Sequence, residues 1–594
     1  MRAVLSDLFY LYSPAQTPAL RVGLLLDSYF LPAAFAEVIK DIQNSNFARI
    51  TLLVFNEPAQ STTVAPVRRP LIVRLLRLLS NQSQRRYLAW NLYCKLDQKL
   101  AKNLPDPTAL VDCSGMLEGI HQLHVAPITK GFVHRFPPEA VETLKEYNLD
   151  VLLRFGFNIL RGDVLRAARY GIWSFHHDDN DHYRGGPACF WEMAEHNPLT
   201  GAMLQVLTEE LDAGRVLIKG LFATARGISL TQNRLQPFWG TTHFVIQKLW
   251  ELHQHGWDFV ESRILPAAPY KGKRKIYRTP TNHQILRWFV PELLIKSSRR
   301  LFHLPTVYHW RMGLRLNASQ HLSITSEDLH NFHWIESPPG YFYADPFPVE
   351  HSGRQWVFFE SWNYNQKRAV ICCAEVLEDS RLGSPRLALD TGKHASYPYL
   401  FYDEDTLYMI PETLEHKAIR LYRCIEFPDH WELEKELLQG PFVDTSVLRH
   451  NGLWWLFTTV QEPRTYANIS YLFFSEAITG PWRYHPENPI SADVRCIRGA
   501  GTIEYRNGQL IRPVQDCSIS YGYGINFMEI LEINTSRYRE QRIRFLQPPR
   551  HSELLRIHTY NRSGCLEVID GATARAEFSV MQKPKKQKSI KLNE

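Results

Sequence analysis

Short apolar runs separated by amphipathic segments make up the first 260 residues of the chain. Residues 21–27 and 48–56 are apolar runs of strand length, and residues 32–43 between them carry Phe35, Val38 and Ile42 at helical spacing. This strand–helix–strand order predicts a doubly wound sheet. Further strands are predicted at residues 108–114, 149–155, 171–175, 201–207 and 213–221, and helices at 137–147, 163–169, 187–195 and 230–255.

The pattern changes to β from about residue 334 onward. Short aromatic and aliphatic runs alternate with turns, and Asn451-Gly452 and Asn507-Gly508 lie between paired runs, as tight hairpins require. A unit recurs in which an acidic residue precedes an aromatic hairpin: Asp345 in Ala-Asp-Pro-Phe and Asp444 in Val-Asp-Thr-Ser. Repeated hairpins of this kind predict a β-propeller, for which we expect five blades.

The predicted fold class is therefore multidomain, α/β followed by all-β, because 594 residues exceed what one hydrophobic core supports. The predicted parts are a Rossmann-like α/β domain over residues 1–260 with an insertion at about 60–105, a basic amphipathic linker over 261–325, a five-bladed β-propeller over 326–545, and an extension over 546–594 with a disordered basic tail. No Gly-x-Gly-x-x-Gly follows the first strand, which argues against dinucleotide binding.

The net charge and the cysteine content argue against several classes of function. A net charge of +7 is mild for this length and the basic residues are mostly scattered, so we expect no nucleic-acid partner. Nine cysteines without Cys-x-x-Cys spacing argue against a disulfide or zinc scaffold. We expect a soluble, cytoplasmic protein and predict no oligomeric state. For the basic amphipathic segments at 66–104 and 271–315, packing on a domain and peripheral contact with a membrane both stay open.

One loop, residues 171–186, concentrates titratable side chains after a predicted strand: it holds three histidines and three aspartates. Ser174 and His176 point to the same side of that strand, and Asp212 lies in a turn further on. A base, an orienting acid and a hydrogen-bond donor suit acyl transfer to an amine. His176, His177 and His182 with the neighbouring aspartates are also the residue types of a metal site, but a loop run lacks the ligand spacing of a helix or hairpin, so no metal ligands are assigned.

Residues 149–220 resemble the formyltransferase catalytic domain found in methionyl-tRNA and sugar N-formyltransferases. The motifs that carry the resemblance are, in chain order, Ser174-x-His176, Tyr183-Arg184-Gly185, Thr200-Gly201 and Leu211-Asp212-Ala213-Gly214. The resemblance implies a formyl donor, 10-formyltetrahydrofolate. It also implies that His176 is the base, Asp212 its orienter, and Ser174 the hydrogen-bond donor where the family has Asn.

The same resemblance places further binding residues. The segment that contains Phe155, Gly156, Asn158 and Leu160 resembles the folate side of the family's site. Arg184 and Gly185 are the corresponding substrate-side residues, with Arg184 assigned to contact with a phosphate or to structure.

A second group of candidates lies in the β-rich part. Asp345, Glu412 and Asp444 each follow or begin a predicted strand, and three carboxylates at a propeller axis could act on a glycosidic bond. Indole rings stack on sugars, which makes candidates of Trp362, Trp454 and Trp455. A third set comprises arginines and an amide that could hold an anionic group: Arg498, Arg512 and Gln515, beside Gly499.

Residues 325–545 resemble the arabinanase-like five-bladed propellers and, more closely, the N-terminal domain of the plant glucosamine inositolphosphorylceramide transferases. The leading hypothesis is a formyltransferase that acts on the amine of an amino sugar in polysaccharide or glycolipid biosynthesis. Two alternatives stay open. One is a formyltransferase fold that has lost catalysis beside a carbohydrate-binding propeller, and the other is a propeller that is itself a glycosidase or transglycosylase.

Overall fold

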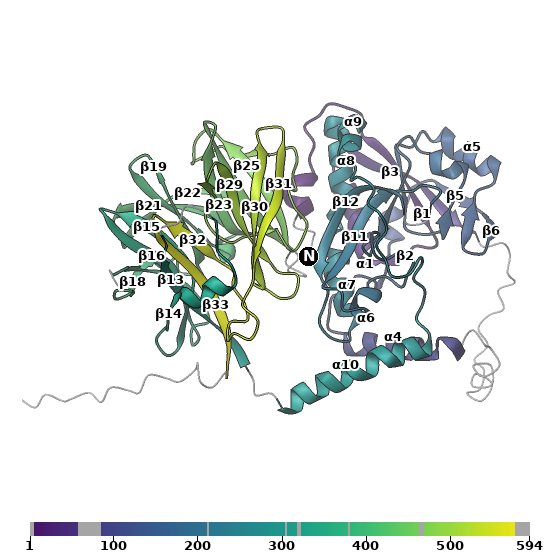
Figure 1. Ribbon diagram of the computed structural model, residues 1–594. Helices are drawn as coiled ribbons and strands as arrows, with labels where there is room; N and C mark the ends of the chain where they lie inside the picture. Colours follow the sequence, from purple (N-terminus) through teal and green to yellow (C-terminus); the bar gives the residue numbers. More distant parts are fainter. Residues whose placement is uncertain are drawn as a thin grey trace, which may run out of the picture. The chain divides into compact units, whose positions relative to one another are not determined.

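The computed structural model describes residues 5–57, 85–210, 213–302, 306–317, 322–377, 381–462 and 468–576. The chain divides into two compact units, formed mainly by residues 1–300 and 301–594. The first is an α/β unit and the second is built of β-sheets (Figure 1). Much of the predicted insertion, the predicted basic tail and Asp212 lie outside the described residues.

A seven-stranded sheet forms the centre of the α/β unit, in the order β12-β11-β10-β8-β1-β3-β5. The five strands from β10 to β5 are parallel, and β11 and β12 continue the sheet as an antiparallel hairpin. The bounds are β1 Leu20–Leu26, β3 Ala48–Asn56, β5 Gln122–Val125, β8 Val151–Arg154, β10 Ile172–His176, β11 Leu199–Val206 and β12 Arg215–Ala223. The central strands β1 and β10 are largely apolar and buried, as a parallel sheet covered on both faces requires, with Arg21 exposed on β1 and the polar Ser174 and His176 on β10.

Three predicted elements differ from the structure. The helix predicted at 163–169 is a short 3-10 helix, Asp163–Arg166. The predicted strand at 108–114 shortens to β4 (Leu110–Asp112), which pairs with β2 (Phe30–Pro32) instead of joining the central sheet. The predicted helix at 230–255 is two helices, α7 (Leu230–Trp239) and α8 (His243–His255). At the break, the hydroxyls of Thr241 and Thr242 donate to backbone carbonyls of the preceding turn, which competes with helix continuation.

Helices complete the α/β unit: α1 (Ala33–Asn44), α4 (Leu88–Leu100), α5 (Pro138–Glu146), α6 (Trp191–Ala194), α9 (Trp257–Ser262) and α10 (Asn282–Phe302). Short strands β6 (Ile128–Lys130), β7 (Val133–Arg135) and β9 (Ile159–Leu160) form a small separate sheet. Among the described helices, none has the length and apolar character that crossing a membrane demands.

Five antiparallel sheets make up the second unit. They are β14-β13-β33-β32, β15-β16-β17-β18, β19-β20-β21-β22, β23-β24-β25-β26, and β27-β29-β30-β31 with β28 beside β29. In chain order the bounds are β13 Thr306–Leu316, β14 His333–Ile335, β15 Tyr341–His351, β16 Arg354–Asn363, β17 Arg368–Glu375, β18 Arg386–Leu389, β19 Ser396–Asp403, β20 Thr406–Glu412, β21 Ala418–Glu426, β22 His430–Gln439, β23 Phe442–His450, β24 Leu453–Gln461, β25 Asn468–Ser475, β26 Arg483–Tyr484, β27 Arg498–Gly499, β28 Glu504–Arg506, β29 Gln509–Asp516, β30 Gly524–Ile533, β31 Tyr538–Leu546, β32 Tyr560–Ser563 and β33 Leu566–Ala576.

The first and last strands of this unit pair with each other. Every residue of β13 is in register with β33, so the two ends of the unit share one sheet (Figure 1). The unit therefore extends beyond the predicted 326–545 at both ends, because β13 comes from the predicted linker and β33 from the predicted extension. No local pattern in the sequence predicts the pairing of two strands so far apart in the chain.

A β-bulge recurs in three of these sheets. The register shifts within β15, β19 and β23, and at each shift one non-glycine residue has a positive φ: Asp345 (48°), Tyr397 (45°) and Asp444 (48°). A bulge re-aims the side chain that it carries. This local backbone feature turns Asp345 and Asp444 away from the alternating strand pattern.

Candidate functional site

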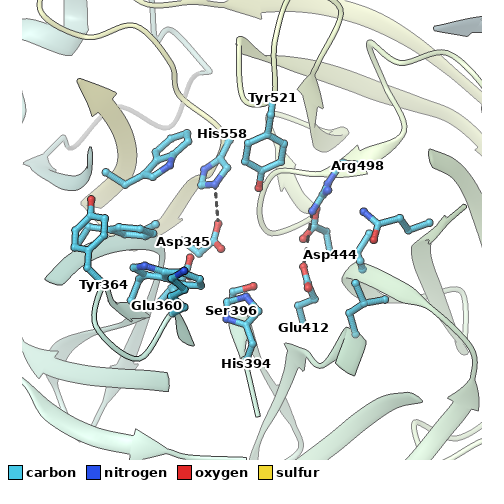
Figure 2. A pocket seen from close by; sticks show the side chains of 18 residues that line it. Asp345, Glu360, Tyr364, His394, Ser396, Glu412, Asp444, Arg498, Tyr521 and His558 are labelled. Atoms are coloured by element: carbon cyan, nitrogen blue, oxygen red, sulfur yellow. Dashed lines mark hydrogen bonds and ion pairs between the residues drawn. The ribbon is translucent and has the colours of Figure 1, made fainter. Parts of the chain in front are cut away.

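A cavity of about 520 Å³ lies in the β unit, and residues from all five sheets or the loops that connect them line it. Figure 2 shows the charged groups that face it: Asp345, Glu360, Glu412, Asp444, Arg498 and His558. The structure therefore brings together the three carboxylates Asp345, Glu412 and Asp444, which are far apart in the sequence.

Arg498 connects two of these carboxyl groups. Its Nε donates to Asp444 Oδ2 at 2.6 Å, and its Nη2 lies 3.7 Å from Glu412 Oε2. Gln515 Nε2 donates to the same Asp444 oxygen at 3.2 Å. Burial and the charge of Asp444 raise the pKa of Glu412 to about 8, although Arg498 opposes the shift. At neutral pH, Glu412 is therefore a protonated acid beside an ion-paired Asp444.

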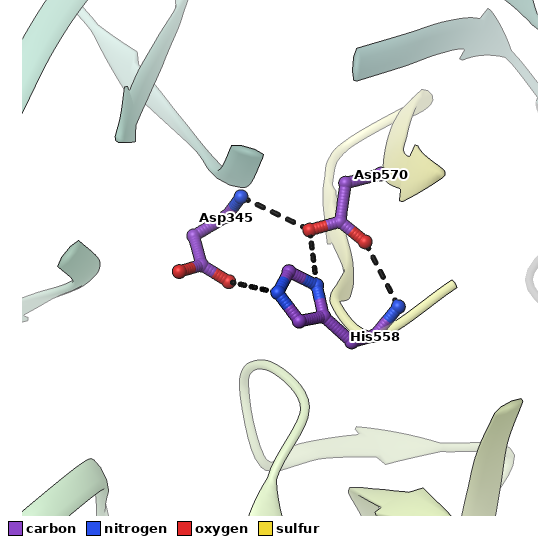
Figure 3. Close-up of side chains that lie close together, drawn as sticks. All are labelled: Asp345, His558 and Asp570. Atoms are coloured by element: carbon purple, nitrogen blue, oxygen red, sulfur yellow. Dashed lines mark hydrogen bonds and ion pairs between the residues drawn. The ribbon is translucent and has the colours of Figure 1, made fainter. Parts of the chain in front are cut away.

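Asp345 lies in a second hydrogen-bonded group. Its carboxylate accepts from the Thr559 hydroxyl at 2.5 Å and from the Tyr397 backbone N–H at 3.2 Å. His558 Nε2 lies 3.8 Å from Asp345 Oδ1, and His558 Nδ1 lies 2.5 Å from Asp570 Oδ2 (Figure 3). Burial raises the pKa of Asp345 to about 6, helped by Asp570 and Asp444 and opposed by His558.

His558 is held between two carboxylates. Burial alone would lower its pKa, but the charges of Asp570 and Asp345 outweigh burial, and the pKa is raised. The ligand atoms of Asp345, His558 and Asp570 lie within 4.8 Å of one another, close enough to suggest a cation site. However, the 2.5 Å between His558 and Asp570 is a hydrogen-bond distance, too short for two ligands that each bind one ion at about 2 Å. The two residues form a buried ion pair.

Glu360 adds a fourth carboxyl group to the cavity. It lies on β16, next to the strand that carries Asp345, and the two strands pair in register at Ala344 and Glu360. Burial, followed by the charges of Asp345 and Glu412, raises its pKa well above the ordinary value. Because like charges this close cannot all ionise, the cavity holds both protonated and ionised carboxyl groups at neutral pH.

Aromatic rings form part of the cavity wall: Trp310, Phe342, Trp362, Tyr364 and Tyr521. Trp362 stacks on Phe342 with centroids 5.8 Å apart, and Trp310 stacks on His558 at 4.0 Å. Of the three tryptophans predicted as sugar-stacking candidates, Trp362 lines the cavity with the carboxylates. Trp454 and Trp455 are 4% and 1% exposed and pack in the hydrophobic interior, because their strand positions point between sheets.

The third predicted set, Arg498, Arg512 and Gln515, likewise contains residues near the cavity and one residue away from it. Arg498 and Gln515 hold Asp444, and Arg498 lines the cavity. Arg512, on β29, does not line the cavity: its guanidinium is bidentate with Glu540, at 2.9 and 2.7 Å, on β31, with β30 between the two strands. Glu540 therefore neutralises the charge of Arg512 within the fold.

In the α/β unit, Ser174 and His176 lie on β10 in the middle of the sheet. His176 Nε2 lies 3.2 Å from the Tyr183 carbonyl oxygen, which can only accept, so the neutral ring carries its proton on Nε2. Ser174 Oγ accepts from Arg154 Nε at 2.9 Å. Arg154 Nη1 also donates to the carbonyls of Phe157 and Asn158, which ties Ser174 to the predicted folate side.

The four predicted folate-side residues have different environments. Phe155 stacks on Phe35 with centroids 4.5 Å apart, and Asn158 is exposed. A Cβ on Gly156 would lie 2.3 Å from the Asp27 backbone nitrogen, so this glycine is needed for close packing. Leu160 is 3% exposed and belongs to the hydrophobic core, because β9 turns it inward.

The acidic loop between β10 and α6 is largely occupied by internal contacts. Lys219 Nζ lies 2.6 Å from Asp179 and 2.8 Å from Asp181, and Asp179 also contacts His182 at 3.0 Å. His177 stacks on Phe238 with centroids 3.6 Å apart, and burial lowers its pKa to about 3. These contacts give the loop a fixed conformation.

Arg184 and Gly185 pack against the segment that follows α9. The Arg184 guanidinium lies over the Tyr270 ring at 4.7 Å, and its carbonyl accepts from the Tyr277 N–H. Gly185 has a φ of 104°, and a Cβ there would lie 2.2 Å from the Tyr277 carbonyl oxygen. The geometry thus gives Gly185 a structural role in place of the predicted substrate contact.

Replacing Gly185 with alanine is expected to lower the free energy of unfolding by about 2–4 kcal/mol, from backbone strain and overpacking. Thermal denaturation measures the loss. Gly186→Ala is the matched control, since the nearest atom to its Cβ is 3.8 Å away, and it should change stability by less than about 0.5 kcal/mol. Equal stability of the two variants would contradict the structural role.

Several site residues were missed from the sequence. His558 and Asp570 lie beyond the predicted end of the β domain, and Tyr521 and Glu360 sit in no motif. The only available signal was for Arg154, a charged residue at the end of an otherwise apolar strand. The other residues become visible only when the strands are paired.

Fold and site together define a two-unit protein, with an α/β sheet unit and a unit of antiparallel sheets around a carboxylate-lined cavity. A family model described as "Glucosamine inositolphosphorylceramide transferase 1, N-terminal" matches residues 333–554. The resemblance predicted for the β-rich part is confirmed over this range.

Individual relatives agree with the family match. Glucosamine inositolphosphorylceramide transferase 1 of Oryza sativa subsp. japonica is 35% identical over 211 residues, which are 34% of this chain and 28% of that protein. The protein of that name from Arabidopsis thaliana is 32% identical over 212 residues, 35% of this chain and 28% of its own length. The chain thus matches a little over a quarter of these relatives.

Solved structures match parts of the chain at low scores. Glycinamide ribonucleotide transformylase 1 from Symbiobacterium toebii has 13% identity and a TM-score of 0.25, covering 44% of this chain and 95% of that one. The α-L-arabinanase of Cellvibrio cellulosa has 11% identity and a TM-score of 0.27, covering 34% of this chain and 77% of that one.

Proposed function

We propose that the cavity of the β unit binds a glycan and catalyses acid–base chemistry at a glycosidic bond, in the transfer or hydrolysis of a glycolipid sugar. The observation that carries the proposal is the protonated Glu412 beside ionised carboxylates in an aromatic-walled cavity. Relatives named for transfer to inositolphosphorylceramide support a glycolipid substrate. We propose that the five sheets are the blades of a closed propeller, which the pairing of β13 with β33 supports.

The residues have distinct roles in this proposal. Glu412 donates its proton to the glycosidic oxygen as the C–O bond breaks, and the bonding electron pair leaves with that oxygen. Asp345 accepts the proton of the incoming hydroxyl, from water or from an acceptor sugar, as the new C–O bond forms. Asp444, paired with Arg498, stabilises the positive charge that develops on the sugar ring. Trp362 offers a face for stacking on the sugar.

Mass spectrometry tests the proposal. The purified protein is incubated with a panel of glycosylated inositolphosphorylceramides and nitrophenyl glycosides, with and without free acceptor sugars. Gain or loss of one glycosyl mass is the expected result. A protein that binds panel members but changes the mass of none would contradict the catalytic part of the proposal.

A second candidate function concerns the α/β unit: formyl transfer from 10-formyltetrahydrofolate to the amine of an amino sugar. The supporting observation is that His176 and Ser174 lie on one strand, and that Arg154 links Ser174 to Phe157 and Asn158. The stacked rings of Phe35 and Phe155 and the exposed Asn158 fit a folate, whereas Gly156 and Leu160 serve packing. The donor would supply the formyl carbon, and His176 would take the amine proton at Nδ1.

Calorimetric titration with a stable formyl-folate analogue tests this second function. Binding by the wild type and loss of formyl transfer in His176→Ala, with the analogue still bound, are expected. No binding at high analogue concentration would leave the α/β unit without a folate role and would not affect the proposal for the β unit.

A further inference from the structure

Helices α4 and α10 pack against each other in the α/β unit through aromatic side chains. The Tyr93 ring meets the rings of Trp288 and Phe289, each with centroids 5.6 Å apart. Asn282 fixes the helix ends, since its Oδ1 accepts from the Ala89 N–H at 2.9 Å and its Nδ2 donates to the Arg85 carbonyl at 2.6 Å. These contacts occupy the inner side of each helix.

The outer side of α4 is unusually apolar. Leu88, Leu92, Leu96 and Leu100 follow one another every four residues and are 42%, 58%, 44% and 70% exposed. Residues four apart lie on the same face of a helix. The inner face of α4 packs on the unit, so the outer face would ordinarily be polar. A row of exposed leucines on that outer face indicates that something else covers it.

Helix α10 continues the same surface with exposed Leu286, Val290, Leu293 and Leu294, which are 53%, 43%, 41% and 65% exposed. The first half of α10 lies beside α4, as the ring contacts of Tyr93 show, and α10 then continues beyond α4 (Figure 1). We call the exposed apolar residues of the two helices together the leucine face: Leu88, Leu92, Leu96, Leu100, Leu286, Val290, Leu293 and Leu294.

The exposed charged residues around the leucine face are basic. Exposed basic residues lie among or beside its leucines: Arg85, Arg86, Lys95, Lys99, Lys102, Arg287 and Lys296. The acidic residues of the two helices are less accessible. Asp97 is 6% exposed and accepts hydrogen bonds from Thr231, and Glu292 is half-buried.

We propose that the leucine face of α4 and α10 binds the surface of an anionic lipid bilayer. Leucines interleaved with lysines suit the boundary between head groups and acyl chains, because the leucines enter the apolar layer while the lysine ammonium groups reach anionic head groups. A protein partner of this face would need matching acidic groups set among apolar ones, whereas an anionic bilayer supplies both everywhere. The proposal is independent of the catalytic role of the β unit.

Flotation of the full chain with lipid vesicles tests the proposal. Binding to phosphatidylcholine vesicles that contain phosphatidylserine is expected, with much weaker binding to phosphatidylcholine alone. Lys95→Gln with Lys99→Gln should weaken binding about thirtyfold, since two basic residues contribute about 1 kcal/mol each. The matched control is Lys130→Gln with Lys145→Gln, which removes equal charge elsewhere on the same unit and should bind as the wild type does.

Leu92→Gln with Leu96→Gln tests the apolar part of the proposal. This variant should lose vesicle binding and keep the wild-type melting temperature, because both side chains are exposed. Leu110→Gln, at another exposed leucine, is its control. Three results would overturn the proposal. The first is equal binding of the wild type to both vesicle types. The second is a large fall in the melting temperature of the leucine variant, which would indicate that another part of the chain covers the face, and the third is a dimer in solution that the leucine variant dissociates.

Discussion

Replacing Glu412 with glutamine is expected to lower kcat/KM for the glycan substrate by a factor of about 10² to 10⁴, the usual contribution of a general acid. Burial and Asp444 raise the pKa of Glu412 to about 8, so the wild type offers a proton to the leaving oxygen at neutral pH. An amide has similar shape and can donate a hydrogen bond, but it cannot transfer that proton. Steady-state kinetics and a binding titration measure the two effects, and affinity should change little.

Glu375→Gln is the matched control for this variant. Glu375 is a half-buried glutamate on β17 that pairs with Arg354, outside the cavity. Its replacement should leave kcat/KM within about twofold of the wild type, because exposed ion pairs contribute little. A Glu412→Gln variant as active as this control would exclude Glu412 as the acid.

Replacing Arg498 with methionine is expected to lower the free energy of unfolding by about 3–5 kcal/mol, because it leaves a buried carboxylate without its cation. Arg498 Nε lies 2.6 Å from Asp444 Oδ2, and both side chains are at most 10% exposed. Denaturant titration measures the loss.

Two comparison variants make this prediction specific. Arg495→Met removes an arginine three residues away whose side chain is 38% exposed beside Asp493, and it should cost less than about 1 kcal/mol. Adding Asp444→Asn to Arg498→Met should restore part of the stability, since it removes the unpaired charge. If the double variant is no more stable than Arg498→Met alone, the pairing is not the source of the loss.

Local patterns predicted the parts of the fold that local physics determines. The apolar runs at β1, β3, β8 and β10 are central strands of a buried sheet, so their sequence alone marks them. The edge strand β5 was missed because Gln122–Val125 is only partly apolar and its outer side is exposed. The break between α7 and α8 was missed although the sequence carries a signal for it, since Pro237 lies in the last turn of α7 and Gly240 is its C-cap residue. The hydroxyl contacts of Thr241 and Thr242 at the break follow these two residues.

For the candidate site too, the sequence predicted the residues that follow a local pattern and missed those that distant strand pairing brings into place. Asp345 and Asp444 were found because each stands at the start of a repeated strand unit, which the structure identifies as a β-bulge with positive φ. His558 and Asp570 were missed because both lie beyond the predicted end of the β domain, and Asp570 is placed by the distant pairing of β33 with β13. For Asp212, which lies outside the described residues, the role beside His176 stays a prediction.

The most direct test of the central claim is the pH dependence of kcat/KM for the substrate found in the panel. Asp345 must be ionised, and its pKa is raised to about 6, so activity should rise with pH through about 6. Glu412 must be protonated, and its pKa is raised to about 8, so activity should fall above about 8. We predict a bell-shaped profile whose alkaline limb disappears in Glu412→Gln. A flat profile, or an alkaline limb that persists in the variant, would contradict acid–base catalysis in this cavity.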